Sequence, residues 1–533
     1  MKTIKLFTLL AVLICTTTSW AQTPTTVTNE NELRTAVQTN NAQIQFANDI
    51  STSSLLEIKN SGTITIDMNG FTLDRGCTSR GSQVIVVRTG STLNLSNGTL
   101  TGGWGGNGGA LDIETGTTVN LTDVIVTGNY ADDRGGGISN SGTLTMTDCV
   151  LSNNISRDNV ENKGGGGLFN YANCTATLTN VTISDNLAYR YGGGIRNEGT
   201  LTIIECAVNS NECSSSSLLE YDGGGIYNHG TLNIDGCIIS SNGCKGKARG
   251  YGIWNDATLN LQGNVQIKDN NANDDKDDDD IYLRTGSKIT VTGELTGGPG
   301  SIGVRMQKPD VFTIGYQSHN SQTDHFFSNI VPNEIVLVNG EAKMRYGYYE
   351  CSWDSENKEV VHTVQYIPES VDVDNICTEK YSHGGVMWGN DYWFIAEGTG
   401  STANGLTCSG SDIYLILCDD SQITINEGLF VNEGTTLHVY SQSYVNRFGA
   451  LFSSGDDSQS GIGPKYDDDG ITHYSGDIDI HGGFISARGG DQAAGIGGCE
   501  DRSSATITIW DGIVNARGGD YGAGIGGGEG GGS

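Results

Sequence analysis

A repeated segment constrains this chain more than any other feature of its sequence. The segment GGGISNSGTLTMTDCVLSNN begins at Gly135, and near or looser copies begin at five other glycines: Gly108, Gly165, Gly192, Gly223 and Gly250. The equivalent aliphatic residues lie 27 to 31 residues apart, at Leu111, Ile138, Leu168, Ile195, Ile226 and Ile253. Regular periods of this length indicate a solenoid or a propeller, in which each repeat is one small structural unit.

Each repeat holds three short stretches with alternating apolar residues. In the copy that begins at Gly135 they are Ile138-x-Asn140, Leu144-x-Met146 and Cys149-x-Leu151. Alternation with period two predicts strands with one face toward a core, and the absence of a helical period between them excludes βαβ units. We therefore expect an all-β fold, a right-handed parallel β-helix of the pectate-lyase-like type over residues 22–304. Its stacked coils would pair in parallel about 4.8 Å apart.

An asparagine recurs at one corner of the repeat. It falls five residues after the third stretch begins in all six copies: Asn129, Asn154, Asn186, Asn211, Asn242 and Asn270. Amides stacked at about 4.8 Å can bond to the copies above and below, as polar ladders do. The spacing predicts such a ladder.

The rest of the chain divides into a cap, a connector and a second array. The segment NENELRTAVQTN predicts a short helix with Leu33, Ala36 and Val37 on one face, which would cover the open end of the β-helix. Residues 305–380 lose the repeat and are interpreted as a connecting module. Residues 381–533 predict a second Gly-rich β-solenoid array, in which Arg488 and Arg517 are 29 residues apart. Because the chain stops within a repeat, we expect a fragment of a longer protein, attached to the cell surface through a further C-terminal region.

The first 21 residues have the pattern of a secretory signal peptide. Lys2 and Lys5 precede an apolar run, and Ser19 and Ala21 are the small residues before a cleavage site. The expected location is therefore secreted, or the bacterial cell surface and outer membrane. No later apolar run reaches 18 residues, so no transmembrane helix is expected. A net charge of -32 argues against nucleic-acid binding.

The cysteines follow the repeats. Cys149, Cys206 and Cys237 share one position on the interior side, and Cys213 and Cys244 share another. Neighbouring coils bring such pairs to about 5 Å, which is within disulfide range. A Cys213–Cys244 bridge and free thiols both remain open. No CxxC pair or Cys/His cluster in the sequence indicates zinc.

The corner pattern permits a comparison with a known family. The GGG[IL]xN corners, followed by SxN about 14 residues later, resemble the GGA[ILV] and FxxN repeats of the polymorphic outer membrane protein family. The resemblance covers residues 105–305, with Val, Leu or Ile in place of the Phe. It implies a β-helix of a bacterial surface protein associated with adhesion.

Several polar residues are candidate sites. Parallel β-helices also host lyases and glycosidases, which need clustered carboxylates with Arg or His. No such set is evident, and His229 occupies a variable turn position, so no catalytic residue is predicted. The acidic runs Asp274, Asp275, Asp277–Asp280 and Asp467–Asp469 could bind Ca²⁺ weakly or form solvated loops. No other cofactor or metal is expected.

A strip of outward residues is the predicted binding surface. Phe169, Tyr227 and Trp254 follow the repeat aliphatic residue, and Arg196 lies between them, so alternation points all four away from the core. Exposed rings could stack on sugars, whereas the alternative is cross-strand stacking. The leading hypothesis is a non-catalytic, adhesin-like protein that binds a host or glycan ligand. A polysaccharide lyase or glycosidase, and a structural surface stalk, are the alternatives.

Overall fold

The computed structural model describes residues 23–530, apart from short breaks at residues 60, 158–162, 215–221, 246–248, 271–278, 321–323, 331–332, 356, 369–372, 378, 383, 390–391, 444–447, 467–474, 502 and 504–505. The predicted signal peptide lies outside this range. The chain forms two compact units. One comprises Met1–Gln307 and Thr313–Phe326, and the other comprises Lys308–Phe312 and Phe327–Ser533.

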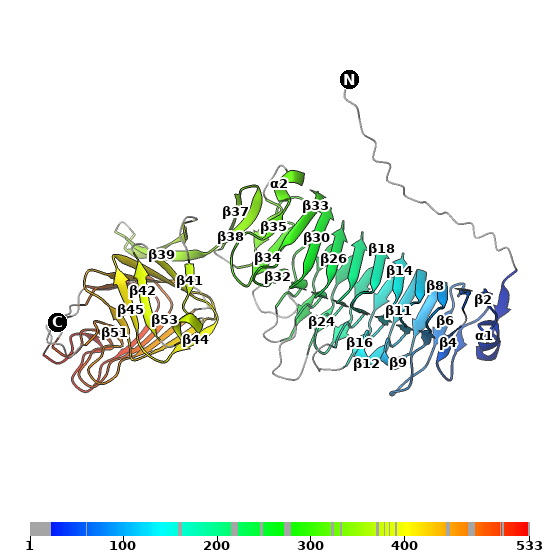
Figure 1. Ribbon diagram of the computed structural model, residues 1–533, viewed down its shortest axis with the longest axis horizontal. Coiled ribbons are helices and arrows are strands. Elements are labelled where there is room, and N and C mark those ends of the chain that lie inside the picture. Colours follow the sequence, from blue (N-terminus) through cyan, green and yellow to red (C-terminus); the bar gives the residue numbers. More distant parts are fainter. Residues whose placement is uncertain are drawn as a thin grey trace, which may run out of the picture. The chain divides into compact units, whose positions relative to one another are not determined.

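The first unit is a parallel β-helix, as the repeats predict. In Figure 1 the strands of successive coils lie side by side along this unit. The first strand of each coil is β10 (Leu111–Ile113), β13 (Ile138–Asn140), β17 (Leu168–Asn170), β21 (Ile195–Asn197), β25 (Ile226–Asn228), β29 (Ile253–Asn255) and β32 (Ile281–Leu283). The second is β11 (Thr118–Thr127), β14 (Thr143–Thr147), β18 (Thr175–Thr179), β22 (Thr200–Ile204), β26 (Thr231–Asp235), β30 (Thr258–Gly263) and β33 (Ile289–Leu295). The third is β15 (Val150–Ser152), β19 (Thr182–Ser184), β23 (Ala207–Asn209), β27 (Ile238–Ser240) and β31 (Gln266–Ile267). Every pairing between these neighbouring coils is parallel.

A fourth, shorter strand is not expected from the sequence. It forms a separate six-stranded parallel sheet: β9 (Trp104–Asn107), β12 (Tyr130–Arg134), β16 (Ile155–Ser156), β20 (Leu187–Ala188), β24 (Glu212–Cys213) and β28 (Gly243–Cys244). In the later coils it is two residues long, which is too short to produce an alternating pattern.

The predicted asparagine ladder is confirmed. The six asparagines are at most 1% exposed. Each Nδ2 donates to the next Oδ1 at 2.9–3.0 Å, from Asn129 to Asn270. A second ladder joins Asn140, Asn170, Asn197, Asn228 and Asn255 at 2.7–2.8 Å. These amides satisfy buried backbone groups at two corners of every coil.

The cap also agrees with the sequence. Helix α1 (Glu30–Ala36) begins after Asn29, whose side chain accepts a hydrogen bond from the Glu32 N–H at 3.1 Å. Leu33, Ala36 and Val37 are buried. The apolar face of α1 therefore packs inward at the first coils.

The structure decides between the two alternatives for the cysteines. Cys213 and Cys244 form a disulfide between paired residues of β24 and β28. Cys149, Cys206 and Cys237 are free and buried. Both outcomes follow from stacking, because equivalent positions of adjacent coils lie opposite one another.

The first unit continues beyond residue 304, the boundary that the sequence predicts. Strand β34 (Ile302–Met306) pairs with β32, and β35 (Thr313–Ile314) pairs with β33. The short helix α2 (Tyr316–His319) follows. Insertions within these last coils hide their period from sequence inspection.

The second unit is also a parallel solenoid, with three sheets. One contains β42 (Gly385–Gly389), β45 (Leu406–Gly410), β48 (Leu429–Val431), β51 (Ile462–Gly463), β54 (Ile496–Gly497) and β57 (Ile525–Gly526). Another contains β44 (Thr399–Thr402), β47 (Gln422–Asn426), β50 (Ala450–Ser454), β53 (Phe484–Arg488) and β56 (Ile513–Arg517). The third contains β41 (Val373–Asn375), β43 (Tyr392–Ala396), β46 (Asp412–Leu417), β49 (Thr436–Ser441), β52 (Asp477–Ile480) and β55 (Ile507–Ile509). Their inward side chains form one core, which includes Leu406, Leu415 and Ile485.

Antiparallel hairpins occupy much of the predicted connecting module. Strand β37 (Glu334–Val338) pairs with β38 (Glu341–Arg345), and β39 (Gly347–Asp354) pairs with β40 (Glu359–Tyr366). The second hairpin adjoins the third sheet, where Tyr349 pairs with Ser441. Tyr346 and Tyr348 pack on Trp393 and Tyr440 in a separate apolar cluster. This hairpin therefore covers the outer face of the third sheet.

Candidate functional site

The predicted binding strip exists as a register, but its surroundings differ from the prediction. The outward position of the first strand runs through eight paired residues, namely Asp112, Ser139, Phe169, Arg196, Tyr227, Trp254, Tyr282 and Arg305. The four predicted residues are therefore adjacent, as alternation indicates. However, Phe169, Arg196 and Trp254 are only 1%, 3% and 6% exposed, so the expected exposure was wrong.

Side chains from neighbouring turns cover the strip. The Arg196 guanidinium lies 5.4 Å from the Phe169 ring centroid and 5.2 Å from those of Tyr191 and Tyr227. It also bonds to Glu198 at 2.8 Å, and Tyr227 stacks on Trp254 at 4.3 Å. The strip is thus a closed cation–π stack that holds the face together.

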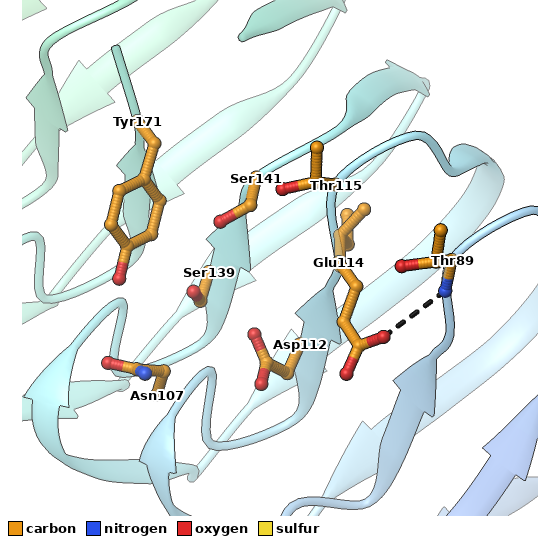
Figure 2. Close-up of a pocket in the computed structure, with 9 residues that line it drawn as sticks. Thr89, Asn107, Asp112, Glu114, Thr115, Ser139, Ser141 and Tyr171 are labelled. Carbon is orange, nitrogen blue, oxygen red and sulfur yellow. Dashed lines mark hydrogen bonds between the residues drawn. The ribbon is translucent and has the colours of Figure 1, made fainter.

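An open cavity adjoins this stack at its N-terminal end. Its volume is about 310 Å³, and it is lined by Thr89, Asn107, Asp112, Ile113, Glu114, Thr115, Ser139, Ser141 and Tyr171. Figure 2 shows Asn107, Asp112, Ser139 and Tyr171 around one opening, with Glu114 on the side toward Thr89. Asp112 and Ser139 continue the register of the strip, and Tyr171 packs on Phe169 at 4.6 Å. The cavity is the part of the predicted face that a ligand can reach.

Two carboxyl groups of the cavity differ in their environment. Burial raises the pKa of Asp112 to about 6. Burial acts in the same direction on Glu114, but the Arg88 guanidinium at 2.6 Å and the Thr89 N–H at 3.1 Å outweigh it and lower the pKa of Glu114. Near neutral pH Glu114 is fixed as a carboxylate, whereas Asp112 can exchange a proton.

The remaining lining groups are hydrogen-bonding groups. The Asn107 Oδ1 is buried and has no hydrogen-bond partner among the described residues. The Tyr171 hydroxyl accepts a bond from Arg134 at 3.5 Å, and burial raises the pKa of Tyr171. Hydroxyl, amide and carboxyl groups beside an aromatic ring match the polar and apolar faces of a sugar. Sequence inspection does not find this cavity, because its members come from separate coils.

The other polar candidates have structural roles or lie outside the described residues. His229 is exposed and pairs with Asp256 at 2.7 Å. Asp274, Asp275, Asp277, Asp278 and Asp467–Asp469 fall outside the described residues. Asp279 and Asp280, the end of the first acidic run, are buried instead of solvated. Asp280 Oδ1 accepts a bond from the Asn270 side chain at 2.8 Å.

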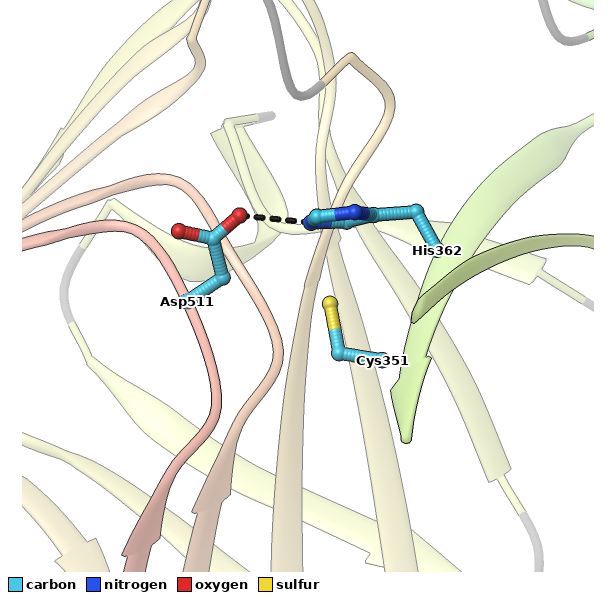
Figure 3. A group of neighbouring side chains, drawn as sticks. All are labelled: Cys351, His362 and Asp511. Atoms are coloured by element: carbon cyan, nitrogen blue, oxygen red, sulfur yellow. Dashed lines mark hydrogen bonds and ion pairs between the residues drawn. The ribbon is translucent and has the colours of Figure 1, made fainter. Parts of the chain in front are cut away.

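Two groups of potential metal ligands lie in the second unit. One consists of Cys351, His362 and Asp511, whose ligand atoms lie within 4.8 Å of one another (Figure 3). The other consists of His438, Asp479 and His481. Sequence inspection misses both, because their members are far apart along the chain. The pairing of Cys351 with His362 would emerge from reading residues 347–366 as a hairpin.

Comparisons with known proteins assign no family. No protein-family model matches the chain, and no curated protein matches it. Among the described residues, no helix is long and apolar enough to cross a membrane.

Proposed function

We propose that this protein is a secreted or cell-surface β-solenoid that binds a glycan in the cavity beside Asp112. The observation that carries the proposal is the polar cavity itself, which opens on an otherwise closed face of stacked aromatic and arginine side chains. The proposal keeps the adhesin-like hypothesis but moves the binding surface from Phe169, Arg196, Tyr227 and Trp254 to the adjoining coils.

The charge of the cavity favours neutral sugars. At pH 7 Glu114 is ionised, and a carboxyl group with a pKa of about 6 is mostly ionised as well. Arg88 is shared between Glu57 and Glu114 and is therefore already neutralised. A polyuronate would bring further negative charge to this site, whereas a neutral sugar offers hydroxyl donors to the two carboxylates.

The location and the family are also part of the proposal. The N-terminal signal pattern supports export, and the GGG[IL]xN corners support a relationship to polymorphic outer membrane proteins. In that setting the solenoid would present its cavity to glycans of a host surface. Attachment to the bacterial surface would use a further C-terminal region.

A glycan array tests the binding proposal. The chain without its leader is applied to immobilised neutral and acidic oligosaccharides, and each positive sugar is titrated by calorimetry. We expect Asp112→Ala to weaken binding at least about tenfold and Tyr171→Phe to weaken it measurably. Asp185→Asn and Tyr189→Phe are matched controls on the same unit, outside the cavity. Equal binding by Asp112→Ala and the wild type would overturn the proposal.

A glycosidase or lyase is the second candidate, because the two carboxyl groups have pKa values moved in opposite directions. Such a pair can divide into a proton donor and an ionised partner. Incubation of the bound sugars with the protein, followed by mass spectrometry, would reveal shortened or unsaturated products. Products that disappear in both Asp112→Asn and Glu114→Gln would establish the enzyme, and uncleaved ligand would establish the binding protein. Absence of both binding and cleavage would favour the structural stalk.

A further inference from the structure

A cysteine, a histidine and an aspartate converge in the second unit. Cys351 on β39 and His362 on β40 are directly opposite each other in the antiparallel hairpin. Asp511 follows β55, and its Oδ2 lies 2.6 Å from the His362 Nε2. Figure 3 shows the Cys351 sulfur and the Asp511 carboxylate directed toward the same side of the His362 ring. Three different elements of the chain therefore contribute one donor atom each.

We propose that Cys351, His362 and Asp511 form a zinc site. A thiolate, an imidazole nitrogen and a carboxylate are the three donor types that Zn²⁺ takes in proteins, and a water completes the tetrahedron when the protein supplies three ligands. Tetrahedral bonds of about 2.0–2.3 Å separate the donor atoms by roughly 3.3–3.8 Å. The three ligand atoms already lie within 4.8 Å of one another, so side-chain rotations suffice to close the site.

The charge around the sulfur supports a cation here. Burial, and then the carboxylates of Asp511, Glu350 and Asp479, raise the pKa of the Cys351 thiol to about 12. This excess of negative charge repels a lone thiolate but attracts a divalent ion, which compensates both the carboxylates and the sulfur. As the Zn–S bond forms, the S–H bond breaks and one proton passes to solvent.

The neighbouring group His438, Asp479 and His481 is already occupied by internal hydrogen bonds. The His481 Nδ1 accepts the Cys351 N–H at 3.1 Å, and its Nε2 lies 3.1 Å from the Asp479 Oδ2. The two ring nitrogens of His438 face Asp412 at 3.2 Å and Asp479 at 3.4 Å. This group therefore supports the backbone of Cys351 and leaves the zinc position to the first group.

The proposed ion has a mechanical consequence. It would bond the two arms of the β39–β40 hairpin to the turn after β55, which belongs to a late coil of the same unit. The hairpin covers Trp393 and Tyr440 on the outer face of the sheet. A zinc clasp would thus hold that cover in place without contributing to the core.

Cobalt substitution tests the site. The full chain without its leader is treated with chelator, dialysed and titrated with Co²⁺, and then with Zn²⁺ in competition. We expect one tightly bound ion per chain, with a thiolate-to-cobalt charge-transfer band in the near ultraviolet that zinc removes. Cys351→Ser should abolish the band, and His362→Ala should weaken affinity at least about tenfold. Cys377→Ser, a free cysteine elsewhere in the unit, should change neither.

Asp511→Ala guards against misfolding as an explanation, because this side chain is 43% exposed and its loss does not disturb a core. It should weaken Co²⁺ binding at least about tenfold while the circular dichroism of the protein is retained. A folded, chelator-treated wild type that binds no Co²⁺ would overturn the proposal. A charge-transfer band that survives in Cys351→Ser would do so as well, and would place the metal elsewhere.

Discussion

Asp280 completes the asparagine ladder of the first unit. Its Oδ1 accepts both the backbone N–H of Asn270 at 3.0 Å and the side-chain amide at 2.8 Å, the two bonds that an asparagine supplies in earlier coils. Asp280 lies 10 residues from Asn270, whereas the other steps of the ladder span 25 to 32 residues. The carboxylate therefore ends the ladder from within an insertion, and needs no further asparagine above it.

This arrangement predicts a difference between two substitutions of Asp280. Asp280→Ala leaves two buried donors of Asn270 unsatisfied and should lower the free energy of unfolding by about 1–3 kcal/mol. Asp280→Asn retains the acceptor and should keep most of that stability. Urea unfolding checks the magnitude, and hydrogen exchange at the Asn270 amide checks the location. Equal stability of the alanine and asparagine variants would mean that the bonds to Asn270 contribute nothing.

The disulfide gives a second prediction. Cys213 and Cys244 close a loop of 31 residues, for which the chain-entropy relation gives about 3–4 kcal/mol. Reduction with dithiothreitol should lower the thermal midpoint of the wild type. The Cys213→Ser/Cys244→Ser double variant should start at the lower midpoint and be insensitive to the reductant. A matched Cys149→Ser variant should still respond, because Cys149 is a free thiol.

The sequence predicted those features that recur and missed those that occur once. The three-strand coil, the ladder from Asn129 to Asn270 and the disulfide all repeat at one position, so period and alternation are sufficient to find them. The burial of Arg196 depends on Tyr191 and Glu198, and no periodic signal marks those contacts. The cavity and the Cys351–His362–Asp511 group are single events of tertiary structure. They follow from which coils and hairpins meet, which spacing along one chain does not reveal.

The raised pKa of Asp112 makes a prediction about pH. Because the folded protein holds this proton up to a pKa of about 6, against an ordinary value of 3.8, it binds more protons than the unfolded chain between these values. The contribution of Asp112 to stability is therefore present below about pH 4, is lost as the pH rises to about 6, and is constant above. Removing the charge should stabilise the protein at pH 7, so Asp112→Asn should unfold at higher urea concentration than the wild type.

The difference between the two proteins isolates this group from the other carboxylates. We expect the gap in unfolding free energy to reach up to about 2–3 kcal/mol at pH 7 and to fall toward zero at pH 4. Asp185→Asn, at an exposed position, should show no such gap. A gap that does not change with pH would contradict the assignment of the raised pKa to Asp112.

Arg196 separates a structural role of the covered strip from a binding role. Arg196 is 3% exposed and is held by Glu198, by the Lys163 carbonyl oxygen at 2.7 Å and by rings on both sides. Arg196→Ala removes these contacts and leaves the Glu198 carboxylate without its partner, so it should cost about 2–4 kcal/mol in the free energy of unfolding. Since no ligand can reach the guanidinium, the folded variant should bind any glycan found on the array as the wild type does. Calorimetric titration of folded Arg196→Ala beside Asp112→Ala decides between the two roles. Loss of binding in the first variant, with binding retained in the second, would return the site to Phe169, Arg196, Tyr227 and Trp254.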